Sequence, residues 1–192
     1  MSKKHKKNNF QIILIVFLIV VLAIGSYILF FGGNKQIKKM YYSRKAMRAF
    51  NDEKNKLGPS ITALGLTDTE KLKPECKEIE KTGESNKSIN CTVTYNKATT
   101  YDSADSVSKA LGNAKILSQQ LGSQGWVKGN YDIDQWFSEV LNKVDYNPDA
   151  TFERLNNNTL CVLQFTVAYS NPKPPTVNVN YSCSTPETKT PF

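Results

Sequence analysis

The first strong pattern in the chain is an apolar run near its N-terminus. Residues 12 to 31 read IILIVFLIVVLAIGSYILFF and include no charged side chain. At a rise of about 1.5 Å per residue, a helix of this length matches the roughly 30 Å hydrocarbon core of a bilayer. Ile12 to Phe31 is therefore predicted to be a single transmembrane helix with membrane lipid as its partner. We expect an uncleaved signal-anchor, because the apolar run continues past the candidate cleavage site at Ala23-Ile24-Gly25.

A second helical pattern follows the apolar run. From Asn34 to Lys56, apolar residues recur roughly on one side of a helix that is otherwise basic; these residues are Ile37, Met40, Tyr41, Met47 and Phe50. Leu57-Gly58-Pro59 is a helix-ending sequence. Residues 32 to 56 are thus predicted to form a basic juxtamembrane helix or stalk.

Two segments near the C-terminus alternate apolar and polar residues with the period of a β-strand. Cys161 to Tyr169 is one, and Val177 to Cys183 is the other. Folding them as a hairpin about Pro172 brings Phe165 opposite Val179 and Cys161 opposite Cys183. A single register therefore aligns the apolar residues and both sulfur atoms.

An earlier pair of segments shows the same arrangement. Residues 89 to 95 alternate in the same way, and a turn at Thr82 to Ser85 brings Cys76 opposite Cys91. Opposed residues on antiparallel strands are close enough for a disulfide. Four cysteines allow three connectivities, and this register selects the local disulfides Cys76–Cys91 and Cys161–Cys183.

The remaining elements complete an α+β domain. One helix is predicted from Asp102 to Gly122 and a shorter one from Asp134, which would bury Trp136, Phe137, Val140, Leu141 and Val144. The predicted fold class is α+β, with an N-terminal single transmembrane helix, then antiparallel hairpins or a meander and one or two packed helices. The expected parts are a cytoplasmic head (1–11), the span (12–31), the stalk (32–56), the extracytoplasmic domain (57–183) and a flexible tail (184–192).

Charge is segregated along the chain. Residues 1–56 hold twelve Lys/Arg and two Asp/Glu, and residues 57–192 hold thirteen and fifteen, so the first part carries +10 and the second −2. A nucleic-acid partner is not expected, since a binding fold for phosphates would carry massed basic residues. The Lys/Arg residues flanking the predicted span are instead suited to anionic lipid head groups.

Orientation is predicted from the cysteines. Basic residues lie on both sides of the predicted span and do not decide it: Lys3, Lys4, Lys6 and Lys7 precede it, and Lys35, Lys38, Lys39, Arg44, Lys45 and Arg48 follow it. All four cysteines follow the span, and disulfides persist in oxidising compartments. We therefore expect a single-pass cell-membrane protein with a cytoplasmic N-terminus and an extracytoplasmic C-terminal domain.

Catalytic motifs are weak throughout. The only histidine, His5, lies in the head, which excludes Ser-His and Cys-His chemistry from the outer domain. Ser106-x-x-Lys109 and Lys81-Thr82-Gly83 resemble fragments of the penicillin-binding and β-lactamase family, but their order is reversed and S-D-N is absent. No catalytic residue and no cofactor are predicted.

Two groups of acidic residues are candidate sites. Asn130 to Asp134 resembles the start of a calcium loop, but Gln135 replaces the required glycine and Leu141 the bidentate glutamate, so no metal site is predicted. A carboxylate pair for glycoside hydrolysis stays open, with these candidates: Asp132, Asp134, Glu139, Asp145 and Asp149.

Surface motifs add little. Four N-x-S/T sequons begin at Asn86, Asn90, Asn157 and Asn180, about as many as chance gives. Pro172-Lys173-Pro174-Pro175 is interpreted as a rigid hairpin loop rather than a polyproline ligand.

The order of the parts resembles a type IV pilin or pseudopilin. Shared features are a short basic head, Phe10, a long apolar helix and a disulfide-bearing antiparallel sheet. Asn9 and Leu14 depart from the residues that define that family. The function hypothesis is a membrane-anchored extracytoplasmic binding, adhesion or scaffold module with a protein or cell-envelope partner. A pilin-like fibre subunit and a cell-envelope hydrolase are the alternatives.

Overall fold

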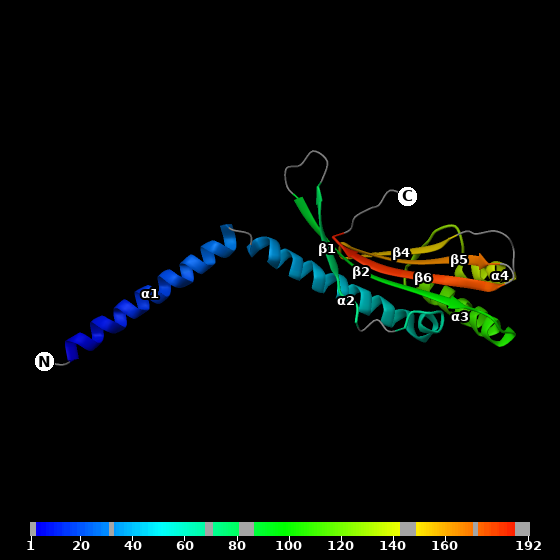
Figure 1. The fold of residues 1–192 in the computed structure, drawn as a ribbon, viewed down its shortest axis with the longest axis horizontal. Coiled ribbons are helices and arrows are strands. Elements are labelled where there is room, and N and C mark those ends of the chain that lie inside the picture. Colours follow the sequence, from blue (N-terminus) through cyan, green and yellow to red (C-terminus); the bar gives the residue numbers. More distant parts are fainter. Residues whose placement is uncertain are drawn as a thin grey trace. The chain divides into compact units, whose positions relative to one another are not determined.

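The computed structural model describes residues 3–30, 33–67, 71–80, 87–142, 149–170 and 173–186. Its elements in chain order are α1 (Lys3–Phe30), α2 (Gly33–Ala63), β1 (Glu75–Glu80), β2 (Lys87–Thr100), α3 (Ala104–Ser123), β3 (Val127–Lys128), α4 (Ile133–Leu141), β4 (Ala150–Asn156), β5 (Thr159–Ser170) and β6 (Lys173–Thr185) (Figure 1). The chain divides into two compact units, residues 1–41 and residues 42–192.

The first unit contains α1, whose apolar side chains are exposed on every side of the helix. From Ile13 to Leu22 each described side chain is at least 47% exposed. Over the described residues, however, no helix is both long enough and apolar enough to cross a membrane. The predicted fold class is therefore wrong in its transmembrane helix; Phe31 lies outside the described residues.

The second unit is the predicted α+β fold, built on one antiparallel sheet. Its six strands lie in the order β1-β2-β6-β5-β4-β3. The predicted hairpin registers are confirmed: Cys161 pairs with Cys183 and Phe165 with Val179, and Cys76 pairs with Cys91. Sequence alternation did not predict the long β2–β6 ladder, which joins the two hairpins into one sheet.

The helices of this unit pack on one face of the sheet, which we call the inner face. Figure 1 shows α2 and α3 beneath the strands. Phe50 of α2 contacts Tyr181 of β6 with ring centroids 4.4 Å apart, and Phe137 of α4 contacts Phe165 of β5 at 5.7 Å. All four side chains are fully buried. Burying an aromatic side chain removes a large apolar area from water, so these contacts dominate the core.

The compact unit begins at Tyr42, whereas the sequence pattern placed its start at residue 57. The apolar stripe of α2 divides into two parts. Met40 and Tyr41 are exposed, but Ala46 and Phe50 are completely buried. The second half of α2 therefore belongs to the core of the domain.

Glycine and serine set the helix ends. Gly58 interrupts α2 with φ 64° and ψ −157°, a conformation suited to glycine, and Pro59 begins the last turn. Ser103, rather than the predicted Asp102, caps α3, and its hydroxyl accepts a hydrogen bond from the Ser106 backbone N–H at 3.2 Å. The element predicted from Asp134 begins at Ile133.

The C-terminal boundary also shifts. β6 runs to Thr185, which is buried and donates a hydrogen bond to the Asn158 carbonyl at 3.2 Å, so the first part of the predicted tail is strand. Several predicted features lie outside the described residues: the turn at 82–85, Val144, Pro172 and the last part of the tail, 187–192.

Candidate binding face

The two disulfides tie neighbouring strands of the sheet. Cys76 is bonded to Cys91 across β1 and β2, and Cys161 to Cys183 across β5 and β6, with Cα atoms 4.0 Å apart in each pair. Cys161 and Cys183 are buried on the inner face, while Cys76 is half-buried on the edge strand. The local pairing matches the prediction.

The other side of the sheet, the outer face, has a different chemistry. Side chains alternate along a strand, so the neighbours of the buried residues point outward. At the described outer positions of β2, β5 and β6 no residue is charged or aromatic, and most are Thr, Asn, Ser or Gln. The uncharged polar residues at these outer positions are Ser88, Asn90, Thr92, Thr94, Asn96, Thr100, Gln164, Thr166, Thr176, Asn178, Asn180, Ser182 and Ser184.

A row of carboxamides crosses the middle of this face. Asn96 of β2 is paired with Asn180 of β6, which is paired with Gln164 of β5. Neighbouring strands lie about 4.8 Å apart, so the row presents one carboxamide per strand. The Asn180 side-chain oxygen is beneath the surface without a hydrogen-bond partner, and Gln164 Nε2 donates to Asp149 Oδ2 at 2.9 Å.

Hydroxyl groups flank the carboxamide row. Thr94 is paired with Ser182 on one side of it. Towards the other end of β6, the Thr100 and Thr176 hydroxyl oxygens are 3.0 Å apart and share a hydrogen bond. Amides and hydroxyls both donate and accept hydrogen bonds, so the face matches ligands that do the same.

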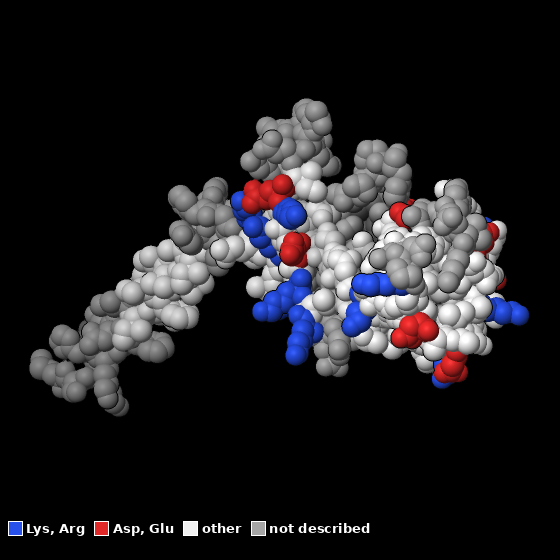
Figure 2. Space-filling view, turned by 45° about the vertical axis from the view of Figure 1, so that its right-hand side comes forward, with Lys and Arg blue, Asp and Glu red and all other residues white. Residues whose placement is uncertain are grey.

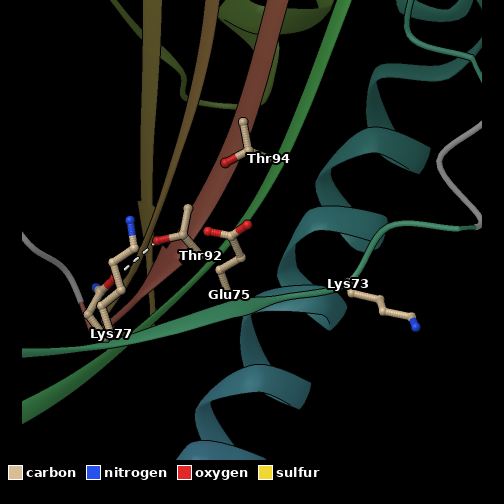
Figure 3. Close-up of a pocket in the computed structure, with 6 residues that line it drawn as sticks. Lys73, Glu75, Lys77, Thr92 and Thr94 are labelled. Atoms are coloured by element: carbon tan, nitrogen blue, oxygen red, sulfur yellow. Dashed lines mark hydrogen bonds between the residues drawn. The ribbon is translucent and has the colours of Figure 1, made fainter.

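A shallow pocket of about 270 Å³ lies at the β1 end of the outer face (Figure 3). The residues lining it are Lys73, Glu75, Lys77, Asn90, Thr92 and Thr94. Register places Glu75 beside Thr92 and Lys77 beside Asn90, and Figure 3 shows Lys73 pointing away from this group.

Hydrogen bonds hold the base of the pocket. Asn90, 7% exposed, donates from Nδ2 to the Pro186 carbonyl at 2.7 Å and accepts from the Thr92 hydroxyl at 3.0 Å. The carboxamide is thereby fixed at the start of the outer face. Together with Asn90, the charged side chains of Glu75 and Lys77 border the outer face at its β1 edge.

A buried carboxylate that the sequence did not single out lies on the inner side. Glu53 is 2% exposed, with Oε2 3.1 Å from Arg154 Nη1 and Oε1 2.8 Å from Lys56 Nζ. The contact with Arg154 is an ion pair without hydrogen-bond geometry. Helical spacing could have revealed it, because Glu53 falls on the same face of α2 as Phe50 and Leu57.

The ion pair has a structural role, since it links α2 to β4 beside the core. Tyr181 donates a hydrogen bond to the Phe50 carbonyl at 3.1 Å. Burial, with a further contribution from the Glu53 charge, raises the pKa of the Tyr181 hydroxyl far above its usual range. These groups are enclosed in packed side chains, so we assign them to stability rather than to ligand binding.

The acidic candidates predicted from the sequence have different partners where the structure describes them. Asp132 pairs with Lys128 at 2.7 Å, Glu139 accepts a hydrogen bond from Gln135 at 3.0 Å, and Asp149 accepts from Gln164. Asp134 lies in the first turn of α4, and Asp145 is outside the described residues. In the described part of the chain, no three His, Cys, Asp or Glu side chains are placed to hold a metal ion.

The S-x-x-K residues serve the ends and surface of α3. The Ser106 hydroxyl accepts a hydrogen bond from the Ser103 backbone N–H at 3.1 Å, and Lys109 Nζ lies 2.6 Å from Asp105. Lys81 to Gly83 fall outside the described residues. The two fragments therefore give no site that the structure describes.

The remaining motifs occupy distinct places. Asn90 is buried, Asn157 forms the exposed β4–β5 turn with φ 48°, and Asn180 belongs to the outer face; Asn86 is not described. Pro175, inside β6, is buried and accepts a hydrogen bond from the Tyr101 N–H at 3.4 Å. This part of the proline-rich segment is therefore strand rather than free loop.

Surface charge on the compact unit is mixed. Residues 42–192 hold eighteen Lys/Arg and seventeen Asp/Glu, a net charge of +1, and Figure 2 shows both signs interspersed on the visible face. Comparison with protein-family models, curated proteins and solved structures finds no match to the chain. Function is therefore inferred from the side chains and surfaces of the protein itself.

Proposed function

We propose that residues 42–192 form an extracytoplasmic binding module whose contact surface is the outer face of the sheet. The two disulfides support the location. All four cysteines of the chain are bonded, and such bonds persist outside the reducing cytosol. The partner is a component of the cell envelope, the compartment that such a domain faces.

One observation carries the choice of surface: three adjacent strands present mostly uncharged polar side chains, and the described helices α2 and α3 lie on the other side of the sheet (Figure 1). A merely solvated protein surface is rich in Lys, Glu, Asp and Arg. Here the described outer positions of the three strands hold none of these residues, and the charged residues that border them include Glu75 and Lys77 on the β1 side and Asp149, which accepts a hydrogen bond from Gln164. Surfaces without charge lose bound water at a lower free-energy cost, which favours contact with a partner.

The partner proposed for α1 is membrane lipid. Ile15, Phe17 and Ile19 are each more than half exposed although they are apolar, and water is an unfavourable environment for such a surface. Lys35, Lys38 and Lys39 follow the helix and would attract anionic head groups. Flotation of the full chain with anionic vesicles tests this association, and recovery of all the protein in the lipid-free fraction would contradict it.

The outer-face proposal is tested by capture from cell-envelope extracts. The full chain in mild detergent is compared with Asn96→Arg, which adds an exposed charge to the outer face. Gln119→Arg, at an exposed position of α3, is the matched control. We expect Asn96→Arg to lose the captured material at an unchanged melting temperature, and Gln119→Arg to retain it. Equal capture by both variants would overturn the proposal.

A further inference from the structure

The chemistry of the outer face restricts the kind of ligand it can take. Anionic polymers are bound through Lys and Arg, and β2, β5 and β6 present neither at their described outer positions. Protein interfaces are enriched in Tyr, Trp, Phe, Met and Arg, and these residues are equally missing from the same positions. Most of the described outer positions offer hydroxyl or carboxamide groups, and the others, such as Leu160 and Val162, are apolar.

These groups are complementary to sugars. A sugar hydroxyl both donates and accepts hydrogen bonds, and so does the carboxamide of the exposed Asn96. The Asn180 oxygen is beneath the surface, and Gln164 Nε2 already donates to Asp149, so these two side chains offer fewer groups to a ligand. Neither partner is charged, so neither must give up the strong hydration of an ion. We propose that the outer face binds an uncharged glycan strand, which lies across the strands along Asn96, Asn180 and Gln164.

Spacing supports this direction of binding. The three carboxamides stand on successive strands, about 4.8 Å apart, which is close to the length of one sugar unit in a glycan chain. Thr94 and Ser182 form the adjacent row. A strand lying across β2, β6 and β5 thus meets one polar side chain per sugar and a hydroxyl beside it.

The edges of the face limit the site. On the β1 side the pocket introduces Glu75 and Lys77, and on the other side Glu153 of β4 lies next to Val162. The uncharged surface therefore covers the three central strands. Because the described outer positions hold no aromatic ring on which a sugar could stack, a dissociation constant on the order of 1 mM is expected for a short oligosaccharide, with stronger retention on a polymer.

This ligand assignment rests on the proposed function, and the test separates the two. Full chain in mild detergent is sedimented with insoluble chitin and with insoluble cellulose, both uncharged, and applied to dextran sulfate as the anionic arm. We expect retention on at least one uncharged glycan that is unchanged between about 0.05 and 0.5 M NaCl, because no ion pair is involved.

Variants identify the surface. Asn180→Arg and Asn96→Arg should each lower retention about tenfold or more, and Gln119→Arg should leave it unchanged. Asn180 has a buried oxygen, so the exposed Asn96 provides the readout if Asn180→Arg fails to fold. Melting curves establish which variants are folded.

Two results overturn the glycan assignment: retention only on dextran sulfate with loss at high salt, and no retention on either uncharged glycan. If Asn96→Arg still abolishes envelope capture in that case, the outer face remains the contact surface and only its ligand is different. Retention that Asn96→Arg leaves untouched would place glycan binding elsewhere and would also overturn the assignment.

Discussion

The inner and outer faces of the sheet are made by alternate residues of the same strands, yet they differ in packing and in chemistry. On β6, Val179 and Tyr181 are completely buried, while Asn178 and Asn180, which alternate with them, point outward and are half-buried. The inner face supplies the apolar contacts that hold the fold. The outer face contributes little to that core, so its composition is free to serve binding. Substitutions on the two faces should therefore separate stability from recognition.

The largest loss of stability is expected when the second half of α2, which packs on the inner face, is removed. A chain of residues 57–192 lacks Ala46, Phe50 and Glu53, all buried against the sheet or its neighbours. Loss of Phe50 alone would cost about 3 to 5 kcal/mol, comparable with the total stability of many domains. Residues 42–192 should show a cooperative urea transition and residues 57–192 none. Similar transitions for both would show that the second half of α2 is dispensable.

Adjacent residues on β5 allow a matched test of the two faces. Phe165→Ala should destabilise the protein by about 3 to 5 kcal/mol, since Phe165 packs against Trp136 and Phe137. Thr166→Ala, on the outer face, should change the free energy of unfolding by about 0.5 kcal/mol or less. Urea unfolding followed by tryptophan fluorescence measures both. Comparable losses would mean that the outer face is also part of the packed structure.

The disulfides should follow the same contrast. Replacing Cys161 and Cys183 together by Ala should cost about 3 kcal/mol, and more than replacing Cys76 and Cys91. The Cys161–Cys183 disulfide joins two buried positions on the central strands β5 and β6, whereas the Cys76–Cys91 disulfide holds the edge strand β1. Thermal unfolding of the two double variants ranks them. A lower melting temperature for the variant without Cys76 and Cys91 would reverse this order.

A smaller effect is expected at alkaline pH. Burial raises the pKa of the Tyr101 hydroxyl to about 12, and it raises that of Tyr181 as well. A raised folded-state pKa contributes stability that is fully present below the unfolded-state pKa of about 10 and is lost as pH rises towards the folded value. Stability should therefore fall between about pH 10 and 12.

Tyr101→Phe sharpens this prediction. The Tyr101 hydroxyl is buried without a hydrogen-bond partner, so its removal should be neutral or stabilising by up to about 1 kcal/mol at pH 7. The variant should also lose less stability above pH 10. Urea unfolding of the wild type and the variant at pH 7 and above pH 10 measures the loss of unfolding free energy in each. An equal loss in the two proteins would show that Tyr101 does not contribute to the alkaline loss of stability.

Sequence alternation predicted the local hairpins because each strand carries its own period of two. The registers of Cys76 with Cys91 and of Cys161 with Cys183 follow from it. The β2–β6 ladder pairs residues such as Tyr95 and Tyr181, which are far apart in sequence, and no local pattern specifies such a pairing. Joining the hairpins into one sheet is therefore a property of the tertiary fold.

The candidate site was hidden for a related reason. Asn96, Asn180 and Gln164 each appear in the sequence as the polar half of an alternating strand, which is typical of a solvated face. Only the assembled sheet places them in one row. Glu53 was missed because its charge suggested an exposed position, although its helical spacing matches that of Phe50 and Leu57.

The contact role of the outer face is tested most directly by measuring how much cell-envelope material the full chain captures with and without a charge at position 96. We predict about a tenfold or greater loss for Asn96→Arg at an unchanged melting temperature, with full capture by Gln119→Arg. Equal capture by the wild type, Asn96→Arg and Gln119→Arg would contradict the assignment of the outer face as the binding surface.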